Sequence, residues 1–311
     1  MSAVYINLIL FTFCVYAILT ISASLTTGLG EMLTMCQAAF FGIGGYVGVF
    51  FLNHLNYSIV EVALLVMLVT GISSLFISYA STRLKGDPFI IVTLSFQMIV
   101  YCIIYNWRTA TGGDSGIYTQ SLKVLFTWEL PQNYHWVLAL VTLILVVLFY
   151  QYLKRMPYGR LLRGIRYNEQ IIASYGKNVN LLKAQTFFIS AALSGLAGML
   201  YASESQFIQP GMLSLDCSIL IITALFIGGK DNWKGAFLGV FIVFFLRDFF
   251  DVSKWPEQWR PSQNIVKNVT LIGNIERALY GLLLILLMYF RPQGLIKDNM
   301  PSSVTSRKET T

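Results

Sequence analysis

The sequence predicts an all-α integral membrane protein, a polytopic helical bundle of about nine transmembrane helices, with eight to ten as the range. Its 311 residues are 56% hydrophobic and only 12% charged, whereas soluble domains carry about a quarter charged residues. The apolar residues also form runs that reach or approach the ~20 residues needed to span a bilayer as a helix. These runs do not alternate as the strands of a membrane barrel do, so they favour helices.

Nine spans follow from the runs, with ends defined to within a few residues. They are 4–27, 36–53, 58–82, 88–107, 134–153, 181–203, 214–229, 235–251 and 272–290. An alternative for the second is a re-entrant segment at 28–42.

The distribution of basic residues predicts the orientation. With the C-terminus inside, alternation places the N-terminus outside, and 15 of the 22 Lys and Arg residues fall on or beside inside segments. Such an excess is typical of cytoplasmic loops, so the net charge of +7 does not predict a nucleic-acid partner. The inside segments are 28–35, 83–87, 154–180, 230–234 and the tail from 291.

The chain is predicted to form one transmembrane domain, residues 1–298, followed by a polar tail at 299–311 that we expect to be disordered. Small residues four positions apart predict close helix packing. They form the pairs Gly44 and Gly48, Ser194 and Gly198, and Gly235 and Gly239.

The sequence contains no pattern that predicts an enzyme. It shows no Ser/His/Asp set, no His/Glu ligand cluster and no closely spaced pair of carboxylates. The stretch IGGKD at 227–231 lacks the first Gly and the final Ser or Thr of a phosphate-binding loop, so we expect no nucleotide, metal or cofactor on this chain. The cysteines (Cys14, Cys36, Cys102 and Cys217) are expected to be small core residues, and His54 and His135 to be solvated in external turns.

Residues 158–176 form a basic amphipathic segment among the spans. We expect one helix of about four turns, too short and too basic to cross a membrane, and ended by Gly176. On periodicity alone it suits either an anionic lipid surface or the groove of a cytoplasmic partner. Its apolar side is Leu161, Leu162, Ile165, Ile172 and Tyr175, and its polar side is Arg160, Arg163, Arg166 and Gln170.

Four polar residues lie in or near spans, where ionisable groups are costly and often functional. Glu61, Glu204 and Asp216 fall near span ends, where their side chains can reach the interface. Gln97 is central and is the better candidate for a pathway residue.

Several stretches, in order, resemble the branched-chain amino-acid ABC importer permeases, and specifically the larger of that family's two permease subunits. They are AAFFGIGGYVGVF, LKGDPFIIVTLSFQMIV, NWRTATGGDSGI, the 158–176 segment, FFISAALSGLAGMLYA and LYGLLLILLMYFRPQGLI. The resemblance covers about residues 28 to 296.

This resemblance implies an importer with a second, distinct permease, two cytoplasmic ATPases that bind ATP and Mg²⁺, and an external solute-binding protein. The 158–176 segment would be the coupling helix that docks on an ATPase. The residues expected to couple are Arg160, Leu162, Arg163, Ile165, Arg166, Glu169, Ile172, Ala173 and Gly176. Aspartate at Ile165 and Ile172 is expected to abolish ATP-driven uptake without preventing insertion.

The remaining site residues are placed by location and by the resemblance. Those expected to line a solute pathway between two permeases are Gln37, Thr93, Gln97 and Ser194. Those expected to face the external binding protein are Thr111, Gly112, Gly113 and Asp114. The chain departs from the family pattern TGGPNGI at Asp114 and Ser115, and from GGLGSLWG at Lys230, Asp231 and Lys234.

The resulting hypothesis is a permease subunit in a bacterial inner membrane that imports a small solute, expected to be a branched-chain or other hydrophobic amino acid, by alternating access. A urea or short-amide permease of the same superfamily is the alternative. More distant alternatives are a self-contained secondary transporter or channel and a membrane scaffold without transport.

Overall fold

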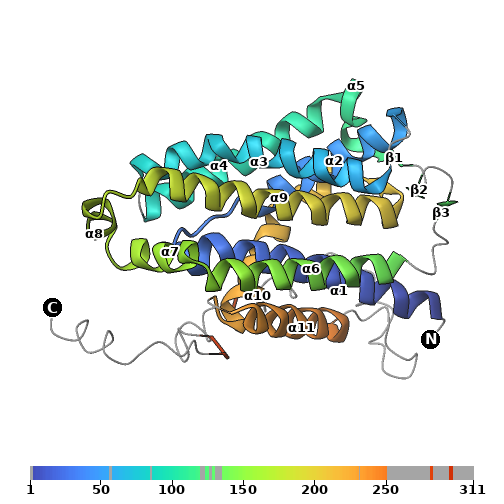
Figure 1. The fold of residues 1–311 in the computed structure, drawn as a ribbon. Helices are drawn as coiled ribbons and strands as arrows, with labels where there is room; N and C mark the ends of the chain where they lie inside the picture. The colour runs from blue at the N-terminus through green and yellow to red at the C-terminus, as the bar shows by residue number, and fades with distance from the viewer. Residues whose placement is uncertain are drawn as a thin grey trace.

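A computed structural model describes residues 3–55, 58–84, 86–119, 123–125, 128–129, 135–230, 232–250, 281–282 and 294–296. These residues form a bundle of long helices with two very short antiparallel strand pairs (Figure 1). The helices are α1 (Ala3–Ser24), α2 (Gln37–Leu55), α3 (Ile59–Arg83), α4 (Asp87–Asn106), α5 (Arg108–Thr111), α6 (His135–Arg155), α7 (Pro157–Tyr167), α8 (Glu169–Ser174), α9 (Val179–Ser205), α10 (Leu215–Gly228) and α11 (Trp233–Phe250).

Three other helical turns and four strands complete the described part of the chain. A π-helical turn, η1 (Leu25–Leu29), extends α1, and the two 3-10 turns are η2 (Gly113–Ser115) and η4 (Pro210–Leu213). Strand β1 (Ile117–Tyr118) pairs with β4 (Phe207–Ile208), and β2 (Lys123–Leu125) pairs with β3 (Trp128–Glu129).

A helix occupies each of the first eight predicted spans, so the all-α membrane class is confirmed. Among the described residues, five helices are long and apolar enough to cross a membrane, namely α1 with η1, α3, α4, α6 and α9, while α2, α10 and α11 are apolar but shorter. The ninth predicted span, 272–290, and the tail at 299–311 lie almost wholly outside the described residues. The total number of spans and the single-domain boundary at 298 therefore stay predictions.

Helix α9 lies at the centre of the bundle, between α2 and α3 on one side and α1 on the other (Figure 1). In its most apolar stretch 78% of the residues are buried, against 28% for α4 and for α6. The apolar side chains that α3, α4 and α6 leave exposed include Phe76, Ile91 and Leu148, which lie on the surface of the bundle. Lipid would solvate these side chains in a membrane.

Glycines bring helices into backbone contact at two crossings. A Cβ atom on Gly198 of α9 would collide with the carbonyl oxygen of Phe41 in α2, and one on Gly44 would collide with the backbone of Gly195. At the second crossing, a Cβ on Gly239 of α11 would collide with a carbonyl of α10. Small residues permit such approach where no hydrophobic force drives helices together, so the predicted close packing is confirmed.

The predicted inside segments gather at one end of the bundle, named here the α8 end. Lys154 Nζ, at the end of α6, donates to Asn232 Oδ1 at 2.7 Å beside α11. The backbone N–H groups of Leu295 and Ile296 donate to the carbonyls of Ile227 and Gly228 at 3.0 and 3.1 Å. The opposite end carries α5 and strands β1 to β3 (Figure 1) and is named the α5 end.

Two expectations about single residues need correction. His135, expected to be solvated, is 1% exposed and pairs with Glu204 through its Nδ1. Cys102, expected in the core, is exposed on α4, whereas Cys14, Cys36 and Cys217 are buried as predicted.

Candidate functional site

Helix α7 packs its apolar side against its own bundle. Pro157 occupies the first turn, where its missing N–H is not needed. Leu162 is 0% exposed and Ile165 is 4% exposed, and both belong to the main core cluster. A Cβ on Gly159 would lie 2.6 Å from the carbonyl of Leu153, so only glycine allows the turn from α6 to be this tight.

The amphipathic segment is two helices, and the predicted single helix of about four turns is wrong. Asn168 adopts an extended backbone, with φ −162° and ψ 111°, and its side-chain oxygen accepts a hydrogen bond from Gln170 N at 2.9 Å. Asparagine is a favoured N-cap, so it ends α7 and starts α8. Helix α8 then packs back on α7, because Ile172 lies against Gly164.

Helix α8 and the residues on either side of it are the most exposed part of this segment. None of the six residues of α8 is buried. The exposed apolar side chains are Tyr167, Ile171 and Tyr175, and Ala173 is exposed beside them. Gly176 has φ +73° and donates to the Ala173 carbonyl at 2.9 Å, which confirms the predicted glycine stop.

Two charged contacts connect this segment to the bundle. Glu169 Oε1 lies 2.6 Å from Lys183 Nζ of α9, and Lys183 is 3% exposed. Arg166 Nη1 donates to the Gly28 carbonyl in η1 at 3.2 Å, and its Nε lies 3.9 Å from Glu31 Oε1.

The other members of the predicted coupling set have lesser contacts. Arg160 is exposed, while Arg163 and Ile172 are half-buried. Tyr158, missed by the sequence analysis, shares a hydrogen bond of 2.8 Å with Thr186 of α9. Burial raises the pKa of the Tyr158 hydroxyl, and the bond to Thr186 partly opposes that shift.

Two of the four predicted pathway residues meet in a buried network at the centre of the bundle, named here the Gln37 network. Ser194 Oγ donates to Gln37 Oε1 at 2.6 Å, and Gln37 Nε2 donates to Ser190 Oγ at 3.0 Å and to Thr26 Oγ1 at 3.4 Å. Ser22 Oγ lies 2.7 Å from Ser194 Oγ. Turn η1 and helix α9 thus bind the side-chain amide of Gln37, the first residue of α2.

The other two pathway candidates lie apart from this network. Gln97 of α4 donates to the carbonyls of Leu213 and Ser214 at 3.3 and 3.2 Å, and it accepts from Ser218 Oγ at 2.5 Å. Thr93 Oγ1 accepts from the Met35 N–H at 3.1 Å. The Met35 contact packs the stretch before α2 against the second turn of α4.

The TGGDSGI stretch forms a tight turn at the α5 end. Thr111 is buried and donates to the carbonyl of Trp107 at 2.7 Å. Gly112 and Gly113 have φ values of +69° and +60°, which favour glycine. Asp114 is exposed at the tip.

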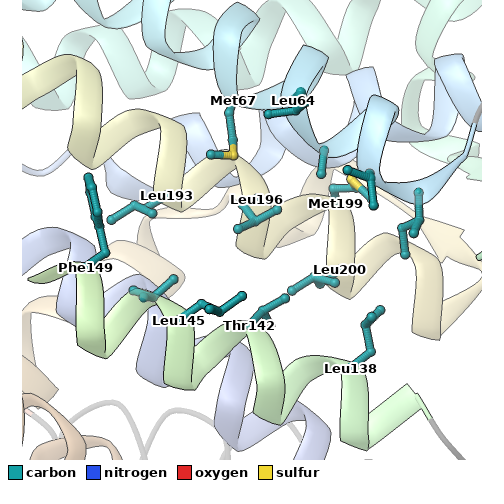
Figure 2. A pocket seen from close by; sticks show the side chains of 14 residues that line it. Leu64, Met67, Leu138, Thr142, Leu145, Phe149, Leu193, Leu196, Met199 and Leu200 are labelled. Atoms are coloured by element: carbon teal, nitrogen blue, oxygen red, sulfur yellow. The ribbon is translucent and has the colours of Figure 1, made fainter.

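An apolar groove of about 360 Å³ opens on the side of the bundle, where residues of α3, α6 and α9 line it (Figure 2). Thr142 is the single polar side chain among those that line it, and its hydroxyl donates to the Ala139 carbonyl at 2.8 Å. The groove therefore offers a polar solute at most the acceptor lone pairs of one hydroxyl, and it suits hydrocarbon. Within the described ranges, no three His, Cys, Asp or Glu side chains are close enough to hold a metal ion.

Comparison with known proteins decides the family. The family model described as the permease component of branched-chain amino-acid transport systems matches residues 5–288. The chain belongs to this permease family.

Curated relatives of this permease agree with the family match. The LivM permease protein of the high-affinity branched-chain amino-acid transport system of Salmonella typhimurium is 27% identical over 92% of this chain and 69% of its own. A LivM branched-chain amino-acid transport permease protein of Methanocaldococcus jannaschii is 27% identical over 96% and 95%. The ribose import permease protein RbsC of Haemophilus influenzae is 25% identical over 64% and 63%. No solved structure matches the permease.

Two side-chain pairs of the permease do not follow from the sequence patterns, Glu169 with Lys183 and His135 with Glu204. The sequence presents Lys183 only as one of the basic residues beside an inside segment, and it favours a solvated His135. A usable signal was present for the second, because His135 and Glu204 fall at the same predicted end of two spans. Lys183 offered none, since its partner Glu169 lies 14 residues away in the chain.

Proposed function

We propose that this permease imports branched-chain or related hydrophobic amino acids as one subunit of an ABC importer in a bacterial inner membrane. The observation that carries the proposal is the family match over residues 5–288. The α8 end would face the cytoplasm, because the predicted inside segments and most of the basic residues gather there. The C-terminus would lie on the same side.

The motor would be supplied by other chains. Two ATPase subunits would bind ATP and Mg²⁺, and α8 would dock on one of them. Leu162 and Ile165 are buried within the permease, so they would not contact the ATPase. The docking surface would instead consist of Tyr167, Ile171 and Tyr175. Exposed apolar side chains of this kind are the anchors that enter the groove in helix-in-groove recognition.

The opposite end would receive solute from an external binding protein. The tight turn at Thr111, Gly112 and Gly113 presents Asp114 outward, where it could pair with a cation of that protein. A carboxylate here makes the contact sensitive to salt, because exposed charges are screened within about 10 Å at 0.1 M ionic strength.

The pathway would lie between this permease and a second one. The solute is a zwitterion, and burying its charges without partners costs many kcal/mol. The groove between α3 and α6 is apolar, and the amide groups of Gln37 and Gln97 are already hydrogen-bonded within the chain. A second subunit would therefore supply the polar wall of the pathway. Gln37, Thr93, Gln97 and Ser194 are buried within this chain, so they would reach the solute only after a movement of their helices.

Alternating access would follow from the difference in solute affinity between two states. ATP-driven closure of the ATPases would displace α8 and favour one state, and release of nucleotide would favour the other. The solute shifts this equilibrium only by its differential affinity for the two states.

The test is reconstitution of the complete complex in proteoliposomes with its binding protein. We expect ATP-dependent uptake of labelled leucine that unlabelled isoleucine or valine suppresses and urea does not. Suppression by urea alone would show that the substrate is a short amide and not an amino acid. Uptake that needs no ATPase subunit would overturn the assignment to an ABC importer.

A further inference from the structure

Helix α8 is connected to the bundle by an ion pair whose cation, Lys183, is buried and whose carboxylate, Glu169, is half-buried. Glu169 is the first residue of α8, and its carboxylate lies 2.6 Å from the ammonium of Lys183. The same ammonium donates to the Ser81 carbonyl of α3 at 3.4 Å. Lys183 is 3% exposed, so water cannot replace the carboxylate, and removing one partner of such a pair leaves a buried uncompensated charge.

This contact restricts how α8 can move. Glu169 directly follows the cap at Asn168, so its position is tied to the start of α8. Lys183 belongs to the second turn of α9, a helix of 27 residues. A displacement of α8 must therefore either break the ion pair or carry the end of α9 with it.

Helix α9 leads from this contact to the Gln37 network. Ser190 is seven residues beyond Lys183, which is almost two full turns and thus nearly the same helix face. Ser190 accepts a hydrogen bond from Gln37, and Ser194, one turn later, donates to it. A shift of α9 along its axis or about it would change both bonds.

We propose that the Glu169–Lys183 ion pair is the internal linkage through which displacement of α8 moves α9 and the Gln37 network. Glu169 then acts toward its own bundle, and Lys183 is a positioning residue that acts through α9 rather than on the solute. The inference rests on the proposed function, because it takes the ATPase as the source of the displacement.

The test is a mutant cycle in the complete reconstituted complex, measuring leucine taken up per ATP hydrolysed. The variants are E169Q, K183Q, the double variant E169Q/K183Q and the exchanged pair E169K/K183E. We expect each single variant to lower uptake per ATP by roughly tenfold, within the range typical of coupled sites. The double variant should be no worse than either single one, and the exchanged pair should recover most of the wild-type ratio.

Lys177→Gln is the matched control. Lys177 is an exposed cation between α8 and α9. It has the same charge as Lys183 and lies near it in the chain, but it is not buried. It should retain the wild-type ratio of uptake to hydrolysis.

Two results would overturn the linkage. One is loss of ATPase binding in E169Q with normal uptake in K183Q, which would make Glu169 a docking residue. The other is multiplicative loss in the double variant together with no recovery in the exchanged pair. Co-purification of the wild-type permease with the ATPase is measured separately. If the two do not co-purify, the result contradicts the proposed function, and it leaves the ion pair as a link between α8 and α9 untouched.

Discussion

Ile165 and Ile171 provide a direct test of which part of the 158–176 segment would dock on the proposed ATPase subunit. They are six residues apart, yet Ile165 is 4% exposed in the core and Ile171 is 53% exposed on α8. Aspartate at Ile171 should leave folding nearly unchanged, because surface substitutions usually change stability by about 0.5 kcal/mol or less. In an apolar docking groove the same carboxylate would cost several kcal/mol, or roughly 100-fold or more in affinity for the ATPase.

Aspartate at Ile165 should act on folding instead. It removes the burial of an isoleucine, about 1.5–3 kcal/mol, and it adds the larger cost of a buried unpaired charge. The sum of about 4 kcal/mol or more is a large part of a typical stability of 5–15 kcal/mol. The expectation from the sequence, that aspartate at Ile165 leaves insertion intact, is therefore replaced.

The assay compares yield, thermal unfolding in detergent, ATPase co-purification and uptake for I171D and I165D, with Ile171→Leu as the control that keeps the apolar surface. We expect I171D to be folded but unable to bind the ATPase, and I165D to be poorly recovered. Wild-type ATPase binding by I171D would refute the docking surface. An I165D protein with unchanged melting temperature would refute the packing argument.

Three further predictions concern the bundle itself. Gln37→Leu removes the hydrogen bonds that Ser194, Ser190 and Thr26 share with one amide. Each hydroxyl keeps another partner, so the variant should cost about 0.5–1.5 kcal/mol for each bond lost. The melting temperature should fall accordingly, and an unchanged melting temperature would show that the network is not stabilising. Gly198→Ala should sharply lower the yield of folded protein, because its Cβ would collide with a carbonyl of α2. Gly211→Ala is its control, since the nearest atom to that Cβ is 3.7 Å away, and equal yields would disprove the close crossing. Glu204→Gln should lower the melting temperature by weakening the contact with buried His135, and His135→Gln combined with it should add little further loss; additive losses would show that the two side chains do not act as a pair.

The fold was largely predictable because hydrophobicity alone locates spans. The first eight predicted spans agree with helices to within a few residues, since a run of apolar residues in a membrane can satisfy its backbone only as a helix. The glycine pairs were also predictable, because a four-residue spacing places Gly44 and Gly48 on one helix face. Which partner helix they contact was not, because the chain order does not say that α2 crosses α9.

The candidate site was less predictable because its contacts join distant parts of the chain. Gln37 and Ser194 were chosen separately by location, and their hydrogen bond spans 157 residues. The break at Asn168 was overlooked because helical periodicity continues through it, although asparagine is a strong N-cap. The burial of Ile165 was missed for a related reason: an amphipathic pattern shows that one face is apolar, and it does not show whether that face contacts a partner or the chain itself.

The two glycine crossings divide the described bundle into two packed units with α1 between them. Helices α2 and α9 form one unit and α10 and α11 the other, since each pair is in backbone contact. Helix α1 contacts both, through Ser22 at Ser194 and through Phe13 against the ring of Phe237. Its end is the π-helical turn η1, a feature that frequently marks functional positions, and Arg166 binds a carbonyl of that turn. If one unit rotated against the other, α1 would have to shift its contacts with at least one of them. The α7–α8 segment is already bonded to the end of α1, through Arg166 and the Gly28 carbonyl.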